Sequence, residues 1–394
     1  MNQWARRAAW AMVFAILPFA TGCNGFFVYP GSLPGGSTSG SDYVYVANAT
    51  TGTLAGFSVG TGTLTAVSGS PYTLGFTPSA VVVNPADTIV FVAGTSGGLG
   101  YIAAYSIGSG GALTLLTNNA VGVASEVAMD VSPNGEWLLG LDRSGQALGS
   151  AIVDEYTINT STGALTLGTG VSYNIGSASL SPTPGSVVPS GIKIAPGGGL
   201  VFVALGTAGT MDFTFNQSST SGALTASQTA FLASGSGLAD NALTVSPNGS
   251  YLYVARSGTN GGVAAYTISG SSGVLAPVSG TPLAAGTQPY SVVVNSAGTD
   301  VYVANRTSGS ISGYSVASNG TLAALGQSPY NSGNSVTALA IDKTGDYLLA
   351  AAYGGSPDLW LYSFDSSVAG KLDLSNTYST GSDPTNPVAI AATH

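Results

Sequence analysis

A four-part pattern of short strands repeats along most of the chain, and it limits the possible fold more than any other feature. One copy is the stretch 241–278, which reads NALTVSPNGSYLYVARSGTNGGVAAYTISGSSGVLAPV. It predicts four strands and no helix, because Gly and Ser interrupt it at short intervals and the apolar residues between them are β-branched or aromatic. A repeat of this length predicts an all-β array of four-stranded units.

Each of the four strand patterns occurs seven times. The expected inner strands are Ala80–Asn84, Val127–Val131, Gly191–Ala195, Asn241–Val245, Ser291–Asn295, Ala338–Asp342 and Val388–Ala392. The second strands are Tyr43–Ala47, Ile89–Ala93, Trp137–Leu141, Leu200–Ala204, Tyr251–Ala255, Val301–Asn305 and Tyr347–Ala351. The third strands centre on Phe57, Tyr105, Tyr156, Phe213, Tyr266, Tyr314 and Tyr362, and the fourth begin at Leu64, Leu113, Leu165, Leu224, Leu275, Leu322 and Leu372. Seven four-stranded units predict a seven-bladed β-propeller.

The phase of the two ends predicts how the ring closes. The first unit, from Tyr43, lacks an inner strand, and the last segment, 388–392, is an inner strand with no unit after it. Together they complete a seventh blade, so the carboxyl-terminal strand is expected to pair beside Tyr43–Ala47. Such pairing removes the open sheet edge that an unclosed row of blades would leave.

Composition agrees with buried strands and excludes one class of partner. Charged residues make up 6% of the chain and apolar residues 44%, which suits strands that are buried on both faces. The whole chain has only 8 Lys and Arg against 17 Asp and Glu. Nucleic-acid binding needs a basic face, so we expect no nucleic-acid partner.

The amino terminus predicts export and a lipid anchor. Arg6 and Arg7 precede an apolar stretch, residues 8–20, that is too short to span a membrane and is typical of a secretory leader. The run Ala-Thr-Gly-Cys then resembles a bacterial lipobox, and Cys23 is the only Cys. We therefore expect a signal peptide over 1–23, lipidation at Cys23, a Gly/Ser/Pro-rich tether over 24–41 and a propeller over 42–394. The protein would be a monomer in the cell envelope, bound to the membrane only through its lipid.

Several charged residues interrupt the apolar pattern inside the blades. Glu155 and Asp212 stand beside the aromatic of two neighbouring third strands, and we expect exposed ends or local partners for them rather than acid–base chemistry. Asp130 and Lys193 occupy the same place in neighbouring inner strands, so we expect an ion pair. The recurrent aromatic itself is expected to pack between blades.

The best candidates for a ligand site lie in the loops at one face. The loops after second strands and those before inner strands meet around the mouth of the central channel. The expected ligand-binding residues there are Arg143, Arg256, Arg306, Asp240, Tyr72, Tyr290 and Tyr330. Arg forks and Tyr faces suit an anionic or sugar-like small molecule, or an envelope component, and a solvated rim of ion pairs is the alternative. The irregular segment 168–190 is either a lid or a tolerated insertion.

Other chemistry lacks the residues that it needs. There is one Cys and one His, His394, and the sequence has no CxxC or HExxH pattern. A zinc site and a Ser-His-Asp triad are therefore not expected. We also expect no other metal and no cofactor.

The repeat resembles a known family. Ser-Pro-Asn-Gly-Ser-Tyr-Leu-Tyr-Val-Ala at 246–255 and Val-Tyr-Val-Ala-Asn at 301–305 are similar to segments of the seven-bladed lactonase propellers, which include the bacterial 6-phosphogluconolactonases and the YVTN-repeat surface proteins. The resemblance covers about residues 43–392. It implies histidines, an acidic residue and arginines at the channel mouth. Here the stretch before one inner strand, 124–130, has no His, and the acidic residue is matched by Asp142, next to Arg143.

Two functions follow from this comparison of residues. The leading hypothesis is an envelope-anchored propeller that binds a ligand or partner, with the catalytic set degenerate. The alternative is a lactonase that hydrolyses a sugar lactone, with Glu126, Asp142 and Arg143 as the catalytic residues, because ring opening needs a base for water and a donor for the oxyanion.

Overall fold

A computed structural model describes residues 42–394 apart from 121–123, 147–148, 177–186, 219–223, 233 and 383–385. The described residues belong to one compact unit, Thr38–His394. The expected leader, Cys23 and the tether lie outside the described residues, as does most of the irregular part of 168–190. In the described part of the chain, no helix is long and apolar enough to cross a membrane.

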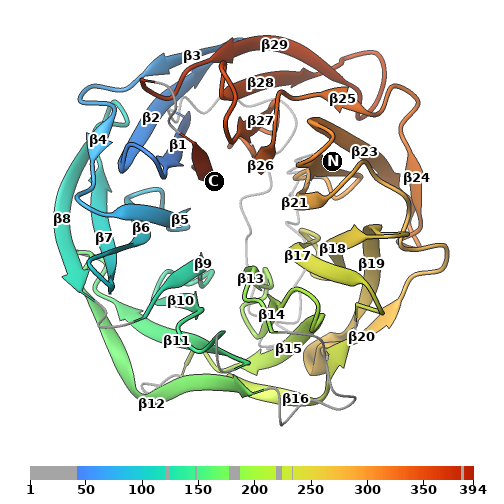
Figure 1. Ribbon diagram of the computed structural model, residues 1–394, viewed down its shortest axis with the longest axis horizontal. Coiled ribbons are helices and arrows are strands. Elements are labelled where there is room, and N and C mark those ends of the chain that lie inside the picture. The colour runs from blue at the N-terminus through green and yellow to red at the C-terminus, as the bar shows by residue number, and fades with distance from the viewer. Residues whose placement is uncertain are drawn as a thin grey trace, which may run out of the picture. The chain divides into compact units, whose positions relative to one another are not determined.

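The strands of the described residues form seven antiparallel sheets around a central axis (Figure 1), which confirms the all-β, seven-bladed propeller. We number the blades in chain order, and blade 1 is the composite one. From blade 1 to blade 7, the inner strands are β30 (Pro387–Ala392), β5 (Thr77–Val83), β9 (Glu126–Val131), β13 (Gly191–Ile194), β17 (Leu238–Val245), β21 (Pro289–Val294) and β26 (Val336–Ile341). In the same order the second strands are β1 (Asp42–Asn48), β6 (Ile89–Ser96), β10 (Trp137–Asp142), β14 (Leu200–Ala204), β18 (Tyr251–Gly258), β22 (Asp300–Asn305) and β27 (Tyr347–Ala352).

The outer half of each blade has two more strands. The third strands are β2 (Thr53–Gly60), β7 (Leu99–Ile107), β11 (Ser150–Ile158), β15 (Thr210–Phe215), β19 (Gly262–Ser269), β23 (Ser310–Val316) and β28 (Leu359–Phe364). The fourth strands are β3 (Thr63–Ala66), β8 (Leu113–Ala120), β12 (Leu165–Gly176), β16 (Leu224–Leu232), β20 (Val274–Pro277), β24 (Leu322–Ala324) and β29 (Leu372–Tyr378). Three short elements were not expected: β4 (Tyr72–Thr73), β25 (Tyr330–Asn331) and a 3-10 turn, η3 (Gly270–Ser272).

The core lies between blades, because each sheet buries both of its faces. The aromatic of the third strand fills this space, as expected: Phe213 and Tyr314 are at most 1% exposed and lie in two different core clusters. The small residues beside it leave room for larger neighbours. A Cβ on Gly56 would stand 2.8 Å from the Val67 side chain and 3.1 Å from the ring of Tyr45.

The charged residues inside the blades have specific neighbours. The expected ion pair is present, with the Lys193 ammonium 3.0 Å from Asp130 across blades 3 and 4. Glu155 and Asp212 are each 1% exposed, so the expectation that their strands reach solvent there is wrong. Glu155 instead accepts a hydrogen bond from the Leu224 amide at 3.2 Å in the next blade. Burial raises the pKa of Glu155 to about 7, and the bond from the Leu224 amide opposes this shift.

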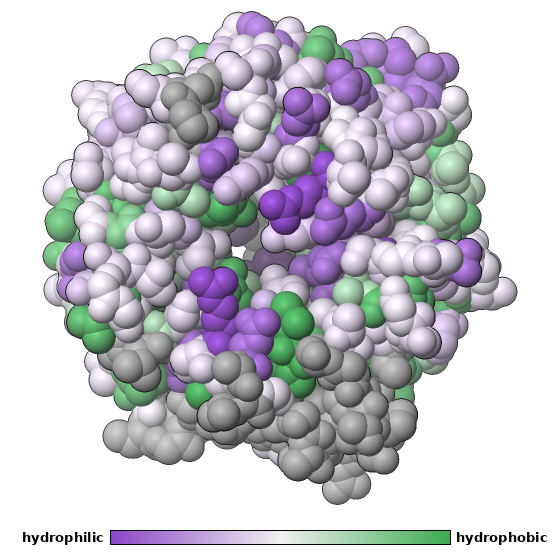
Figure 2. Space-filling model, viewed as in Figure 1, coloured by the Kyte–Doolittle hydropathy of each residue, from purple (hydrophilic) through white to green (hydrophobic). Residues whose placement is uncertain are grey.

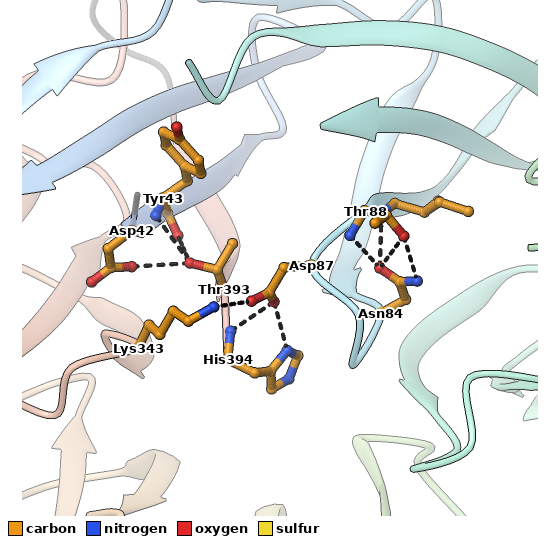
Figure 3. A network of polar contacts seen from close by, with 9 residues as sticks. Asp42, Tyr43, Asn84, Asp87, Thr88, Lys343, Thr393 and His394 are labelled. Carbon is orange, nitrogen blue, oxygen red and sulfur yellow. Dashed lines mark hydrogen bonds and ion pairs between the residues drawn. The ribbon is translucent and has the colours of Figure 1, made fainter. Parts of the chain in front are cut away.

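The carboxyl-terminal strand closes the ring, as predicted. β30 pairs antiparallel with β1, with Val44 opposite Ala392. Beyond this ladder, the Thr393 hydroxyl donates to the Asp42 carboxylate at 3.0 Å and accepts from the Tyr43 amide at 3.0 Å, as Figure 3 shows. Burial raises the pKa of Asp42 to about 8, and the neighbouring Asp342 adds to this shift through a hydrogen bond and through its charge.

An ion pair joins the two blades on either side of the closing strand. Asp87 lies in the turn between β5 and β6, and Lys343 in the turn between β26 and β27. The Lys343 ammonium is 2.7 Å from Asp87, whose other oxygen accepts the His394 amide at 2.8 Å (Figure 3). The chain's single His therefore lies where inner strands end, at the face opposite the expected ligand site.

The irregular segment 168–190 begins as regular structure. β12 continues to Gly176 and pairs with β11 along its length, with Ser150 opposite Gly176. The first part of the segment is thus an extension of the outermost strand of blade 3, and residues 177–186 lie outside the described residues.

Candidate ligand site at the channel mouth

One face of the propeller carries every loop that follows a second strand, because all blades have the same orientation and antiparallel order. Inner strands begin at this face and second strands end there. Figure 2 shows an opening near the centre of the ring on the face in view, with hydrophilic residues along part of its margin. Several predicted site residues lie at or near the ends of these strands and so share one face, which we call the mouth face: Glu126, Asp142, Arg143, Asp240, Arg256, Tyr290 and Arg306.

In blade 3 the carboxyl group of Glu126 is enclosed within its own sheet. Glu126 begins β9, pairs in register with Asp142 at the end of β10, and is 1% exposed. Its carboxylate accepts a hydrogen bond from the Tyr156 hydroxyl at 2.9 Å. It lies over Gly140, where a Cβ would stand 2.5 Å from the carboxyl carbon. Only glycine leaves space for Glu126 at this place.

Burial raises the pKa of Glu126 well above its usual range, and the charges of Asp154 and Asp142 raise it further. The hydrogen bond from Tyr156 opposes this shift without reversing it. The phenol responds in the same sense, because burial and the charge of Glu126 raise the pKa of Tyr156. Burial and the neighbouring carboxylates therefore disfavour the charged form of Glu126, whose side chain is enclosed.

Asp142 shapes the loop that carries Arg143. Its carboxylate accepts hydrogen bonds from the Ser125 amide at 2.6 Å and from the amide and hydroxyl of Ser144, at 2.8 and 2.5 Å. These bonds fix the turn after β10 in the way that Asx turns do. Arg143 follows Asp142 with an exposed side chain and takes part in none of the ion pairs found in the described residues. The structure thus brings Glu126 and Asp142 together, and Arg143 lies one residue beyond them.

In blade 5, Arg256 and Asp240 form a buried, two-pronged ion pair. The Arg256 Nε and Nη2 atoms lie 2.6 and 3.0 Å from the two oxygens of Asp240, and the same Nη2 donates to the Tyr266 hydroxyl at 2.9 Å. Thr210 of blade 4 also donates to Asp240, at 2.8 Å. The side chains of Arg256 and Asp240 are 6% and 0% exposed. Burial alone would lower the pKa of Arg256, but the hydrogen bonds and charge of Asp240 raise it.

Blade 6 presents a different kind of arginine to the mouth face. The Arg306 guanidinium lies 4.8 Å from the ring centre of Tyr290 in its own blade and 5.6 Å from that of Tyr353 in blade 7. Contacts of this kind are worth about 0.5–1 kcal/mol each at exposed sites. All three side chains are half-buried. The structure therefore joins two predicted residues, Arg306 and Tyr290, and adds Tyr353, which the sequence analysis missed.

The other two predicted tyrosines lie elsewhere. Tyr72 is in β4 and Tyr330 in β25, short strands that pair with the third strands β2 and β23. The Tyr72 hydroxyl accepts a hydrogen bond at 2.9 Å from the Leu113 amide, at the start of the fourth strand of the next blade. Both tyrosines thus stand in the outer half of their blades, whereas Tyr290 is in an inner strand.

One sequence signal separates the three arginines, and it was overlooked. When the second strands are aligned on Leu141, Ala255 and Ala304, Arg256 falls on Asp142 and Asn305, and Arg143 and Arg306 fall one residue later. The side chain at the earlier position is buried in all three blades, whereas Arg143 and Arg306 at the later position follow the last residue of their strands. Tyr353 occupies the later position in blade 7.

No group of three or more His, Cys, Asp or Glu within the described residues is placed to hold a metal ion. Seven sheets built on four strands each, with the ring closed by the last strand, define the class of seven-bladed β-propellers. Within that class the chain belongs to the lactonase family of seven-bladed β-propellers, whose model matches residues 43–254, 206–328 and 257–388. Among curated protein sequences, none matches the chain.

Solved structures are similar in fold across nearly the whole propeller. A candidate 6-phosphogluconolactonase from Bacteroides fragilis superposes with a TM-score of 0.73 at 18% identity, over 91% of this chain and 100% of its own. One from Bacteroides uniformis gives 0.72 at 20% identity, over 89% and 99%. The periplasmic gluconolactonase of Pseudomonas aeruginosa gives 0.69 at 16% identity, over 90% and 99%. At these identities the likeness establishes the fold.

Proposed function

We propose that this protein binds a sugar lactone or the corresponding sugar acid at the mouth face, without hydrolysing it. The observation that carries this proposal is that three of the residues expected to do chemistry or bind are engaged inside their own blades. Glu126 is enclosed beside Tyr156, Asp142 holds the loop after β10, and Arg256 is paired with Asp240.

Hydrolysis of a lactone needs a base that reaches water and a donor that stabilises the oxyanion. Glu126 is 1% exposed, so its carboxyl group is shielded from bulk water, and burial raises its pKa well above the usual range. Asp142 is 2% exposed, and its carboxylate already accepts hydrogen bonds from two backbone amides and a serine hydroxyl. His394, the single imidazole, is engaged with Asp87 at the opposite face.

Binding of an anionic sugar needs less, and Arg306 supplies it. A guanidinium stacked between two tyrosine rings is held in one orientation, so little side-chain entropy is lost when its fork meets a carboxylate or phosphate. Tyr290 and Tyr353 also offer ring faces to the C–H surface of a sugar. Arg143, exposed on blade 3, adds a second cation at the same face.

The second candidate function is hydrolysis of a sugar lactone. It is favoured by membership of the lactonase family and by neighbours described as a gluconolactonase and as candidate 6-phosphogluconolactonases. In this reading Arg143 stabilises the oxyanion, and Asp142 or Glu126 acts on water.

One set of measurements separates the two functions. The full-length chain is assayed for hydrolysis of gluconolactone and 6-phosphogluconolactone against the uncatalysed rate, and calorimetry measures binding of gluconate and 6-phosphogluconate. We expect binding without turnover, and at least a roughly tenfold loss of affinity in Arg306→Ala, the cost of one charge-assisted bond. If the wild type exceeds the background and both Glu126→Gln and Arg143→Ala reduce the rate, hydrolysis is the function.

We also propose that the protein is exported and anchored to the cell envelope through Cys23, as a monomer. The apolar stretch 8–20 and the Ala-Thr-Gly-Cys run support this proposal. Metabolic labelling with a radioactive fatty acid tests it: Cys23→Ser is expected to lose the label and to leave the membrane fraction. Retention of the Cys23→Ser variant in that fraction would contradict the lipid anchor.

A further inference from the structure

A cavity of about 270 Å³ opens between blades 6 and 7, apart from the arginine and the tyrosines described above. Its walls come from the loop after β22, from β25 and the segment that leads on into β26, and from the loop after β27 with the start of β28. All three lie on the mouth face, since second strands end and inner strands begin there. The side chains that line it and bear on its chemistry are Thr307, Ser308, Asn331, Asn334, Ser356 and Trp360.

The described lining has no charged side chain; it is made of amides, hydroxyls, glycine backbone, one proline and one indole. Two hydroxyls are already used, since Thr307 donates to the Gln288 side chain at 2.7 Å and Ser308 accepts the Thr287 amide at 3.1 Å. The side chains of Asn331, Asn334 and Ser356 are exposed and take part in none of the hydrogen bonds found among the described residues. Side-chain amides each offer two donors and an acceptor.

Trp360 is the one aromatic residue that lines the cavity, and neighbouring groups hold its indole in place. The indole lies 6.5 Å from the Tyr362 ring at an interplanar angle of 17°, and its Nε1 donates to the Pro357 carbonyl at 3.4 Å. At Gly333 a Cβ would stand 2.7 Å from the same Nε1, and φ is +74°. Glycine at this position therefore satisfies both the turn and the close approach of the ring.

A neutral sugar ring has the complementary chemistry. One side of a pyranose presents C–H groups that pack on an aromatic face, and its rim presents hydroxyls that both donate and accept. The indole and the free amides match these two features, whereas an anion would find no cation in the described lining. The volume is a little below the range of about 300–1,000 Å³ that holds drug-sized ligands, so it suits a single ring.

We propose that this cavity is a binding subsite for one ring of a neutral saccharide, with Trp360 as the stacking wall and Asn331, Asn334 and Ser356 as the hydroxyl-binding groups. This goes beyond the proposed function, which concerns a lactone or sugar acid at Arg306. A neutral ring held here would let the propeller dock on a glycan or on the uncharged part of a larger sugar ligand. An open cavity with few contacts binds weakly, with a dissociation constant of about 1 mM.

The test uses the full-length chain and four neutral probes: the methyl glycosides of glucose, galactose, mannose and N-acetylglucosamine. Saturation-transfer NMR reports contact with the sugar C–H protons, and titration gives the dissociation constant. We expect at least one probe to bind, Trp360→Ala to abolish the transfer, and Asn334→Ala to weaken binding about fivefold, the effect of one lost hydrogen bond. Gln327→Ala removes an exposed amide in blade 6 that does not line the cavity and is expected to bind as the wild type does.

Two comparisons make the result decisive. Trp360→Phe keeps a ring against Tyr362 and is expected to keep the melting temperature and part of the binding. Comparing its melting temperature with that of Trp360→Ala shows whether the alanine variant has lost its fold or only the stacking ring. Arg306→Ala is expected to lose gluconate binding and keep methyl glycoside binding, which separates this subsite from the proposed function. The proposal is overturned if no probe binds, or if Asn331→Ala and Asn334→Ala bind every probe as the wild type does.

Discussion

Loss of the Asp240 charge is predicted to destabilise the propeller strongly, because it leaves a buried guanidinium without its counter-ion. The change is Asp240→Asn, which keeps the size of the side chain and removes its charge. Arg256 is 6% exposed, and the two oxygens of Asp240 meet its Nε and Nη2 atoms. In the variant, the guanidinium keeps only neutral partners, which are the amide oxygen at position 240 and the Tyr266 hydroxyl.

The size of the effect follows from the burial of the pair. Removing one partner of a buried, hydrogen-bonded ion pair costs about 3–5 kcal/mol. Unfolding entropy near the midpoint is about 2.1 cal/mol/K per residue, or roughly 0.7 kcal/mol/K for about 350 residues. The melting temperature of Asp240→Asn is therefore expected to fall by about 4–7 °C.

Calorimetry and urea unfolding measure this change. Asp240→Leu combined with Arg256→Met is expected to be more stable than Asp240→Asn, because it removes both charges from the interior. Lys371→Met serves as the matched control, since it breaks ion pairs at a more exposed place, and a much smaller change is expected. The reasoning is refuted if Arg256→Met retains the wild-type melting temperature and loses gluconate binding, because Arg256 would then serve the ligand and not the fold.

Three further predictions concern the fold. Deletion of 388–394 removes the closing strand and is expected to lower the melting temperature sharply, and an unchanged melting curve would disprove closure by β30. The pKa of Asp42 is raised to about 8, so between about pH 4 and 8 the folded state holds a proton that the unfolded state releases, and the stability of the fold falls as the pH rises. Asp42→Asn is expected to flatten this fall in a series of thermal melts. The same dependence of melting temperature on pH in the variant and the wild type would contradict it. Gly140→Ala places a Cβ 2.5 Å from the Glu126 carboxyl carbon and is expected to cost about 1–3 kcal/mol in urea unfolding, whereas Gly326→Ala, which meets nothing within 4 Å, changes little; equal stabilities would show that Glu126 moves freely.

Much of the architecture was readable because it rests on local, repeated signals. Strand, turn and strand recur with the same spacing, so the number of blades follows from counting, and the phase of Tyr43 and 388–392 reveals the closing strand. The ion pair of Asp130 and Lys193 was predictable for the same reason, since equivalent positions in adjacent blades must face each other.

The candidate site was only partly readable. The sequence placed Arg143, Arg256 and Arg306 on one face but treated them as equivalent, although a one-residue offset turns Arg256 into the sheet and leaves the other two outside it. It also took the Pro-Tyr pairs as one group, and Tyr72 and Tyr330 stand in the outer half of their blades.

The sequence by itself determined the strand order, the sevenfold repeat and its closure, because alternation and turn residues act over neighbouring positions. The tertiary structure decided which polar side chains bond to partners inside the fold and which remain exposed to a ligand. Glu126 is enclosed over Gly140 of the next strand, which leaves room for its carboxyl group. Arg306 contacts the ring of Tyr353 in another blade. Trp360 meets its amide neighbours only where blades 6 and 7 converge. These contacts depend on how the sheets twist and pack against each other, and the spacing of residues within one repeat does not predict that packing.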